Sequence, residues 1–188
     1  MLFRSHDLEA APTGQRPITD WLYRRILNRL PPEERAIAES AALLRRFDDG
    51  IIQMLLPQST PKAVRTFAQT YATWVRPHTA GGWAIHSLVG RARDAACHQE
   101  DPLRLQKFHH QAAAAWQRRW EATQNPADRA EALYHTFWAD ETMAVEAWNE
   151  EVQEHILVAD REAWRSVAML PTEPRLAEKP LQPATLAT

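Results

Sequence analysis

Apolar residues recur at helical spacing through most of the chain between residues 18 and 170. In the first half of this region, the stripes predict four short helices over residues 19–30, 32–46, 51–56 and 60–71. Prolines and capping side chains separate these helices: Pro31-Pro32, Asp48-Asp49 and Ser59-Thr60-Pro61. The pattern therefore predicts short, well-delimited helices in this half.

Between residues 73 and 86 the spacing of apolar residues changes from helical to every second residue. Residues 73–76 and 83–86 read as strands, and the turn between them contains Gly81 and Gly82, which tolerate positive φ. A helix is expected to resume here, with Ser87 as its cap. Several helices, a hairpin and a further helix form the pattern of a winged helix.

From Asp101 onward the pattern is helical throughout. Helices are expected to begin near residues 101, 126, 140 and 160, and consecutive antiparallel helices of this kind build helical-repeat solenoids. The predicted fold class is mainly α: a winged-helix module with a short β-hairpin over residues 18–99, then an antiparallel, TPR-like helical repeat or bundle over 100–170. Residues 1–17 and 171–188 are rich in proline and small polar residues, so we expect a flexible leader and a disordered tail.

Composition narrows the function classes. The chain has 188 residues, 45% of them hydrophobic, and a formal net charge of -2, which is typical of a soluble globular protein. Its five glycines form no phosphate-binding loop, and its one cysteine, Cys97, excludes an internal disulfide. The sequence has neither a long apolar segment nor a signal peptide. We therefore expect a cytoplasmic protein without a cofactor.

Two segments carry a resemblance to a known family. Residues 30–35 (LPPEER) lead into 42–48 (ALLRRFD), and residues 81–89 read GGWAIHSLV. Together they resemble the winged helix, and the start of the helical-repeat arm, of STAND-type (NB-ARC) signalling ATPases. The chain departs from the family pattern at Ser87, where aspartate is usual, and at Gly90, where arginine is common. No ATPase core is present, so the chain looks like a fragment, a split partner or a reduced relative.

The resemblance implies a non-catalytic regulatory or protein-interaction module, similar to the hinge and sensor arm of such an ATPase. It also implies a protein partner, with a P-loop ATPase as the leading candidate. In the family, the histidine that corresponds to His86 contacts the β-phosphate of ADP. With a partner ATPase core, His86 and Ser87 would therefore sense nucleotide. The simpler interpretation, which we favour without that core, is that His86 ends a strand and packs on the next helix.

The alternative function is a small winged-helix DNA-binding regulator with a helical dimerisation or ligand domain. Lys62 and Arg65 lie three residues apart on the helix predicted at the recognition position, and Arg76 lies on the predicted hairpin. These cations could contact phosphates. The chain has no dense basic stripe and a negative net charge, so nucleic acid is the less favoured partner. A membrane is not expected as a partner.

Metal binding and catalysis have little support. Adjacent histidines such as His109 and His110 point about 100° apart on a helix and cannot chelate one ion together. Two pairs have the i, i+4 spacing of metal ligands, and exposed Glu–His helix pairs are the more ordinary explanation for both: Glu131 with His135, and Glu151 with His155. Cys97 next to His98 is not a catalytic dyad. The expectation is therefore no enzyme activity and no metal site.

Aromatic residues of the second half suggest a protein-binding surface. Tryptophan and arginine are enriched among residues that dominate interfaces. If they are exposed, Trp120 and Trp138, beside Arg118 and Arg119, would mark the place where a partner docks. Helix–helix packing is the other interpretation of these tryptophans.

Overall fold

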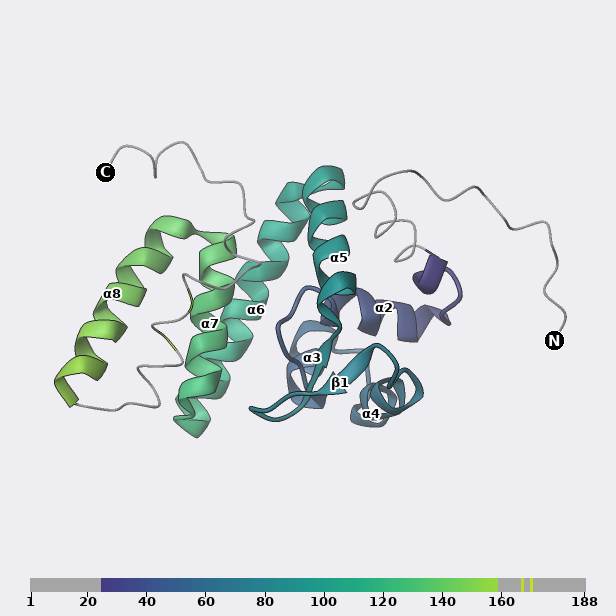
Figure 1. The fold of residues 1–188 in the computed structure, drawn as a ribbon, viewed down its shortest axis with the longest axis horizontal. Helices are drawn as coiled ribbons and strands as arrows, with labels where there is room; N and C mark the ends of the chain where they lie inside the picture. The colour runs from purple at the N-terminus through teal and green to yellow at the C-terminus, as the bar shows by residue number, and fades with distance from the viewer. Residues whose placement is uncertain (1–24, 159–166, 168–169, 171–188) are drawn as a thin grey trace, which may run out of the picture.

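The computed structural model describes residues 25–158 together with residues 167 and 170, and side chains up to residue 153 and at those two positions. The described chain is mainly helical with a short two-stranded antiparallel hairpin, which confirms the predicted fold class (Figure 1). The elements in chain order are α2 (Pro32–Ala41), α3 (Asp49–Leu55), α4 (Pro61–Thr70), β1 (Val75–Pro77), β2 (Trp83–Ile85), α5 (Ser87–Glu100), α6 (Pro102–Thr123), α7 (Pro126–Ala139) and α8 (Glu141–Val158). The predicted leader, the tail and most of the helix expected at 160–170 lie outside the described residues.

Local capping chemistry sets where most helices begin. The side chains of four N-cap residues accept a hydrogen bond from the first turn of α3, α4, α6 and α7: Asp48, Thr60, Asp101 and Asn125. Proline occupies the first turn of α2, α4, α6 and α7, where its missing N–H costs nothing. The predicted starts of these helices are therefore confirmed.

Three local predictions are wrong. Helix α2 ends at Ala41, five residues early, because Phe47 forms an antiparallel bridge with Trp83 and the preceding residues turn toward it. The first predicted helix does not reach residue 30, since residues 25–27 are helical and a turn follows. The cap of α5 is His86 rather than Ser87, because the imidazole Nδ1 accepts a hydrogen bond from the Leu88 backbone N–H at 3.3 Å.

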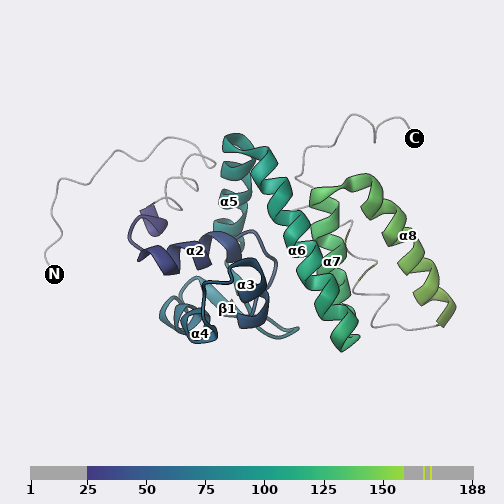
Figure 2. The ribbon, with the colours of Figure 1, turned by 180° about the vertical axis from the view of Figure 1, so that it is seen from behind.

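The first half has the element order of a winged helix. The bridge at Phe47 stands for the first strand, α3 and α4 follow, and β1 and β2 pair in the register Val75↔Ile85 and Pro77↔Trp83. Gly82, with φ +74°, permits this arrangement because a Cβ there would lie 2.3 Å from the carbonyl oxygen of Phe47. In both ribbon views the tip of the hairpin points toward α6 and α7 (Figures 1 and 2).

The second half is an arm of antiparallel helices that pack on their neighbours in sequence. Helix α6 packs on α7, and α7 packs on α8. Residues beyond α8 also contribute to the arm, since Val167 and Leu170 are buried against it and the Trp148 indole N–H donates to the Val167 carbonyl at 3.0 Å. Helices α4 and α8 lie at opposite ends of the described molecule (Figure 1).

The main hydrophobic core crosses from the winged helix into the arm. It joins Ile52 and Phe67 of the winged helix to Trp116 of α6 and Ala132 of α7. Helix α6 also packs directly on α3. The two predicted modules therefore share one core, and α6 is the element that belongs to both.

Candidate functional site

A buried arginine joins the winged helix to the arm. The side chain of Arg46 is 2% exposed, and one guanidinium nitrogen donates to Asp128 of α7. Its Nε lies 3.4 Å from a carboxylate oxygen of Glu131, and Nη1 donates to the carbonyl of Ala80 in the hairpin turn at 3.3 Å. The guanidinium also lies 4.4 Å from the ring centre of Trp116. One cation thus contacts the wing, α6 and α7.

Two further arginines complete this cluster, which we call the joint: Arg45, Arg46, Asp48, Arg119, Asp128 and Glu131. Arg45 Nε donates to Glu131 at 3.2 Å. Arg119 donates to Asp48, and its Nε lies 3.3 Å from Asp128. Burial opposes the charge of Arg119, but its bonds to the two aspartates outweigh that effect and raise its pKa.

The charges of the joint balance, with three arginines against three carboxylates. Asp48 has a second role, because its other oxygen caps α3. Because each carboxylate already holds an arginine, the joint offers no surplus positive charge to a phosphate. Its geometry suits it to fixing the winged helix on the arm rather than to binding an anion.

A pair of buried histidines forms a second contact within the arm. His109 of α6 and His135 of α7 are both 0% exposed, and their Nδ1 atoms lie 2.8 Å apart. The ring of Trp138 stacks on His109, with 5.0 Å between ring centres. A hydrogen bond between two Nδ1 atoms requires one ring to carry the proton there and the other to accept it. The neutral pair therefore has opposite tautomers.

This pair overturns the expectation for Glu131 and His135. They are 4% and 0% exposed and do not form an exposed helix pair. Glu131 bonds instead to the arginines of the joint, and Glu151, also buried, pairs with Arg129 at 2.7 Å. The side chain of His155 lies outside the described side chains. The sequence did contain a signal for His109, which falls in the apolar stripe between Leu105 and Ala112.

The predicted nucleotide-sensing residues lie at the start of α5. His86 is half-buried, and its Nδ1 is occupied by the cap of that helix. The other ring nitrogen, Nε2, is the one that this cap leaves for a contact with a partner. Ser87 and Leu88 beside it are exposed.

The predicted phosphate-contacting residues lie on an open surface. Lys62, Arg65 and Arg76 are all exposed, as are Thr66 and Gln69 of the same outer face of α4. Helix α4 packs on α2, α3 and β1 and leaves this face uncovered. The guanidinium of Arg65 is partly neutralised, since Nη1 donates to Asp49 at 2.9 Å.

A charge signal around α4 was overlooked in the sequence. Residues 51–93 contain no aspartate or glutamate, and five lysines and arginines. The segment therefore has a formal charge of +5, against -7 for the rest of the chain. The negative total charge hides this local excess.

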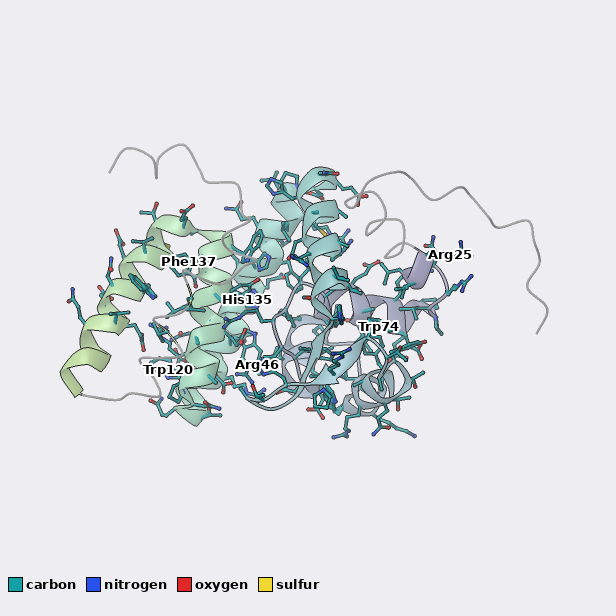
Figure 3. All side chains as sticks on the ribbon, viewed as in Figure 1. Arg25, Arg46, Trp74, Trp120, His135 and Phe137 are labelled. Carbon is teal, nitrogen blue, oxygen red and sulfur yellow. The ribbon has the colours of Figure 1, made fainter. Side chains whose placement is uncertain are left out.

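The four residues of the predicted partner surface do not share one surface. Arg118 is exposed, but Arg119 belongs to the joint. Trp120 is half-buried against the guanidinium of Arg129, 4.8 Å from the ring centre. Trp138 is half-buried and stacks on His109, which in turn contacts His135. In Figure 3, Trp120 lies well apart from His135. Three of the four side chains, Arg119, Trp120 and Trp138, thus contact partners inside the protein.

The remaining candidates have no neighbours that suggest chemistry. Within the described residues, no group of three potential ligands could hold a metal ion. Burial raises the pKa of the Cys97 thiol, which disfavours the reactive thiolate. Among the described helices, none is long and apolar enough to cross a membrane.

Comparison with known proteins adds no family. No protein-family model matches the chain, and no curated protein matches it significantly. The resemblance to STAND-type ATPases rests on the residues quoted above.

Proposed function

We propose that the protein is a non-catalytic cytoplasmic regulatory module that binds a protein partner, similar to the hinge and sensor arm of a STAND-type ATPase. The joint carries this proposal. Because a balanced set of buried ion pairs and a continuous core bind the winged helix to the arm, the two parts move as one body. A partner bound at one end therefore displaces the other end.

Two exposed apolar side chains support partner binding, one on the winged helix and one on the arm. On the winged helix, Leu88 is 46% exposed beside His86 and Ser87, where a nucleotide-holding module would lie. On the arm, Met143 of α8 is 60% exposed. Stacked antiparallel helices offer extended surfaces of this kind to partners.

The direct test is binding to a P-loop ATPase encoded beside this protein. The two purified proteins should form a complex on size-exclusion chromatography with ADP present. His86→Ala should weaken that complex at least about tenfold if the imidazole contacts the nucleotide, since a lost charge-assisted hydrogen bond costs about 1.5–3 kcal/mol. His98→Ala, at an exposed histidine of the same helix, is the matched control. The absence of such an ATPase, or of any complex with it, would contradict the proposal.

Duplex DNA is the second candidate partner, and the open face of α4 favours it. The face is exposed, and α4 itself has no acidic residue, although Asp49 of α3 pairs with Arg65. The surrounding segment 51–93 has an excess of positive charge. Lys62 and Arg65, three residues apart on one face of α4, would contact neighbouring phosphates, with Arg76 as a third contact. The wing tip contributes less, because Arg46 holds its Ala80 carbonyl toward the arm.

Fluorescence anisotropy with a mixed-sequence duplex at low salt tests this second candidate. Each phosphate contact contributes about 0.9 to the slope of log affinity against log salt, so Lys62→Ala with Arg65→Ala should reduce the slope by roughly 2. Lys107→Ala with Arg118→Ala removes the same charge from exposed positions on α6 and should leave the slope unchanged. No binding at low salt would exclude DNA.

A further inference from the structure

The histidine pair lies where the arm is held together. His109 is on α6, which packs on α3 of the winged helix, and His135 is on α7, which holds two carboxylates of the joint. The two rings are stacked at 30° with 5.0 Å between their centres. Tyr134 meets His135 edge-on, and Trp138 covers His109. Protonation of this pair therefore places charge between the two helices that connect the arm to the winged helix.

The pair tolerates one added proton but not two. In the neutral pair, one Nδ1–H donates to the other Nδ1. A proton added to Nε2 of the donor ring leaves that bond in place. A second proton has to go to the accepting Nδ1, which then becomes a donor 2.8 Å from another donor. Two buried positive charges would face each other across the α6–α7 contact, so the contact must open.

The charged neighbours do not offset that second charge. Glu131 lies one turn before His135 on α7, and it already bonds to Arg45 and Arg46. Arg45, from the segment before α3, also lies 4.6 Å from the ring centre of Tyr134. On α5, Cys97 packs in the cluster that includes Trp138, and its raised pKa keeps it a neutral thiol.

We propose that the His109–His135 pair is an acid-sensitive contact that opens the packing of α6 on α7 within the arm when both rings are protonated. In the unfolded chain each histidine takes up its proton near pH 6.5. The folded pair withholds at least one of these protons, so the unfolded state binds more protons below that pH. Stability is fully present above pH 6.5 and is lost as the pH falls, by about tenfold in the folding equilibrium constant per pH unit for each proton withheld.

Urea unfolding at pH 7.5, 6.5 and 5.5, followed by circular dichroism, tests the proposal. The wild type should lose roughly fivefold or more in its equilibrium constant between pH 6.5 and 5.5, since the unfolded histidines are already half protonated at pH 6.5. The variant His109→Gln/His135→Gln, whose amides can bond without taking up protons, should lose clearly less. The control His98→Gln/His110→Gln replaces two exposed histidines and should keep the wild-type dependence. A wild type without this loss, or a pair variant that retains it, overturns the proposal.

NMR of the wild type decides the matter even if the pair variant does not fold. Imidazole ¹H–¹⁵N spectra should show two rings of opposite tautomer at pH 7.5, and at least one should remain neutral below pH 6. The exposed His98 and His110 provide the reference rings in the same spectra. Two pair resonances that titrate together with these exposed rings would overturn the proposal.

Discussion

The joint and the histidine pair are two buried polar contacts in one small protein, and they differ in how they respond to pH. The joint uses arginines, which stay charged at every relevant pH, against three carboxylates. The pair uses two imidazoles that share a proton and carry no fixed charge. The first contact spans the winged helix and the arm, and the second lies within the arm, between α6 and α7.

The difference separates a contact that stays formed over a wide range of pH from a contact that depends on pH. A balanced buried ion cluster is costly to break at one partner, because the remaining charge stays in the interior. A histidine pair contributes only while its proton count is right, so mild acid changes it and leaves the joint intact. The protein therefore has one contact that defines its shape and one that can report on its surroundings.

The largest expected effect is the loss of Arg46. Arg46→Ala leaves Arg45 and Arg119 against the three carboxylates of the joint, so one negative charge stays uncompensated in the interior. It also removes the cation from the face of Trp116, so unfolding should become easier by about 3–5 kcal/mol. Urea unfolding at pH 7.5 measures this. Arg65→Ala, whose ion pair with Asp49 is 55% exposed on the arginine side, should cost no more than about 1 kcal/mol. Equal costs for the two variants would remove the distinction between joint and surface.

A second variant separates stranded charge from lost packing. Arg46→Met/Asp128→Asn removes one charge of each sign and keeps an apolar stem over Trp116. It should therefore recover at least about 1 kcal/mol relative to Arg46→Met alone, as expected for coupled buried partners. A double-mutant cycle gives the coupling directly. Strict additivity of the two changes would mean that the pair is not energetically linked.

The next largest effect concerns the close packing of Gly82 in the hairpin turn against Phe47, which is next to Arg46 of the joint. Gly82→Ala would bring a Cβ to 2.3 Å from the Phe47 carbonyl oxygen, so it should break the Phe47–Trp83 bridge and displace the neighbouring Arg46. Gly81→Ala has the same kind of backbone, with φ +89°, but open space around the added carbon. Gly81→Ala should cost about 1 kcal/mol from the backbone alone, and Gly82→Ala clearly more. Thermal unfolding of both variants makes the comparison.

Local chemistry explains what could be predicted from the sequence. Caps such as Asp48, Thr60 and Asn125 act on backbone groups two or three residues away, so the helix starts could be read from their neighbours. The mainly α fold with a hairpin follows from the same short-range signals. The end of α2 could not be predicted, because Phe47 leaves the helical path to pair with Trp83, which is distant in sequence.

The candidate site was harder to predict for the same reason. Arg46 and Asp128 are 82 residues apart, and His109 and His135 are 26 apart. The i, i+4 spacing of Glu131 and His135 suggested that they contact each other, but across the arm each binds a different partner. The sequence shows that these charged and histidine residues are present. Which of them pair depends on how α6 and α7 pack on each other and on the winged helix.

The smallest expected effect is on the alkaline side, at a surface contact that responds in the opposite direction to the histidine pair. The Tyr71 hydroxyl donates to Glu34 at 2.5 Å, and this bond, with burial and the carboxylate charge, raises the pKa of Tyr71 to about 12. The folded protein thus keeps a proton that the unfolded chain loses near pH 10. The contribution of this contact to folding stability is present below pH 10 and is lost as the pH rises toward 12.

Glu34→Gln should return the phenol absorbance titration of Tyr71 toward pH 10, and Glu33→Gln, beside it on α2, should not. At pH 7 either change should alter stability by less than about 1 kcal/mol, because the contact is near the surface. An unchanged titration in Glu34→Gln would mean that the carboxylate does not hold the phenolic proton, and the contrast with the histidine pair would then rest on the acid side alone.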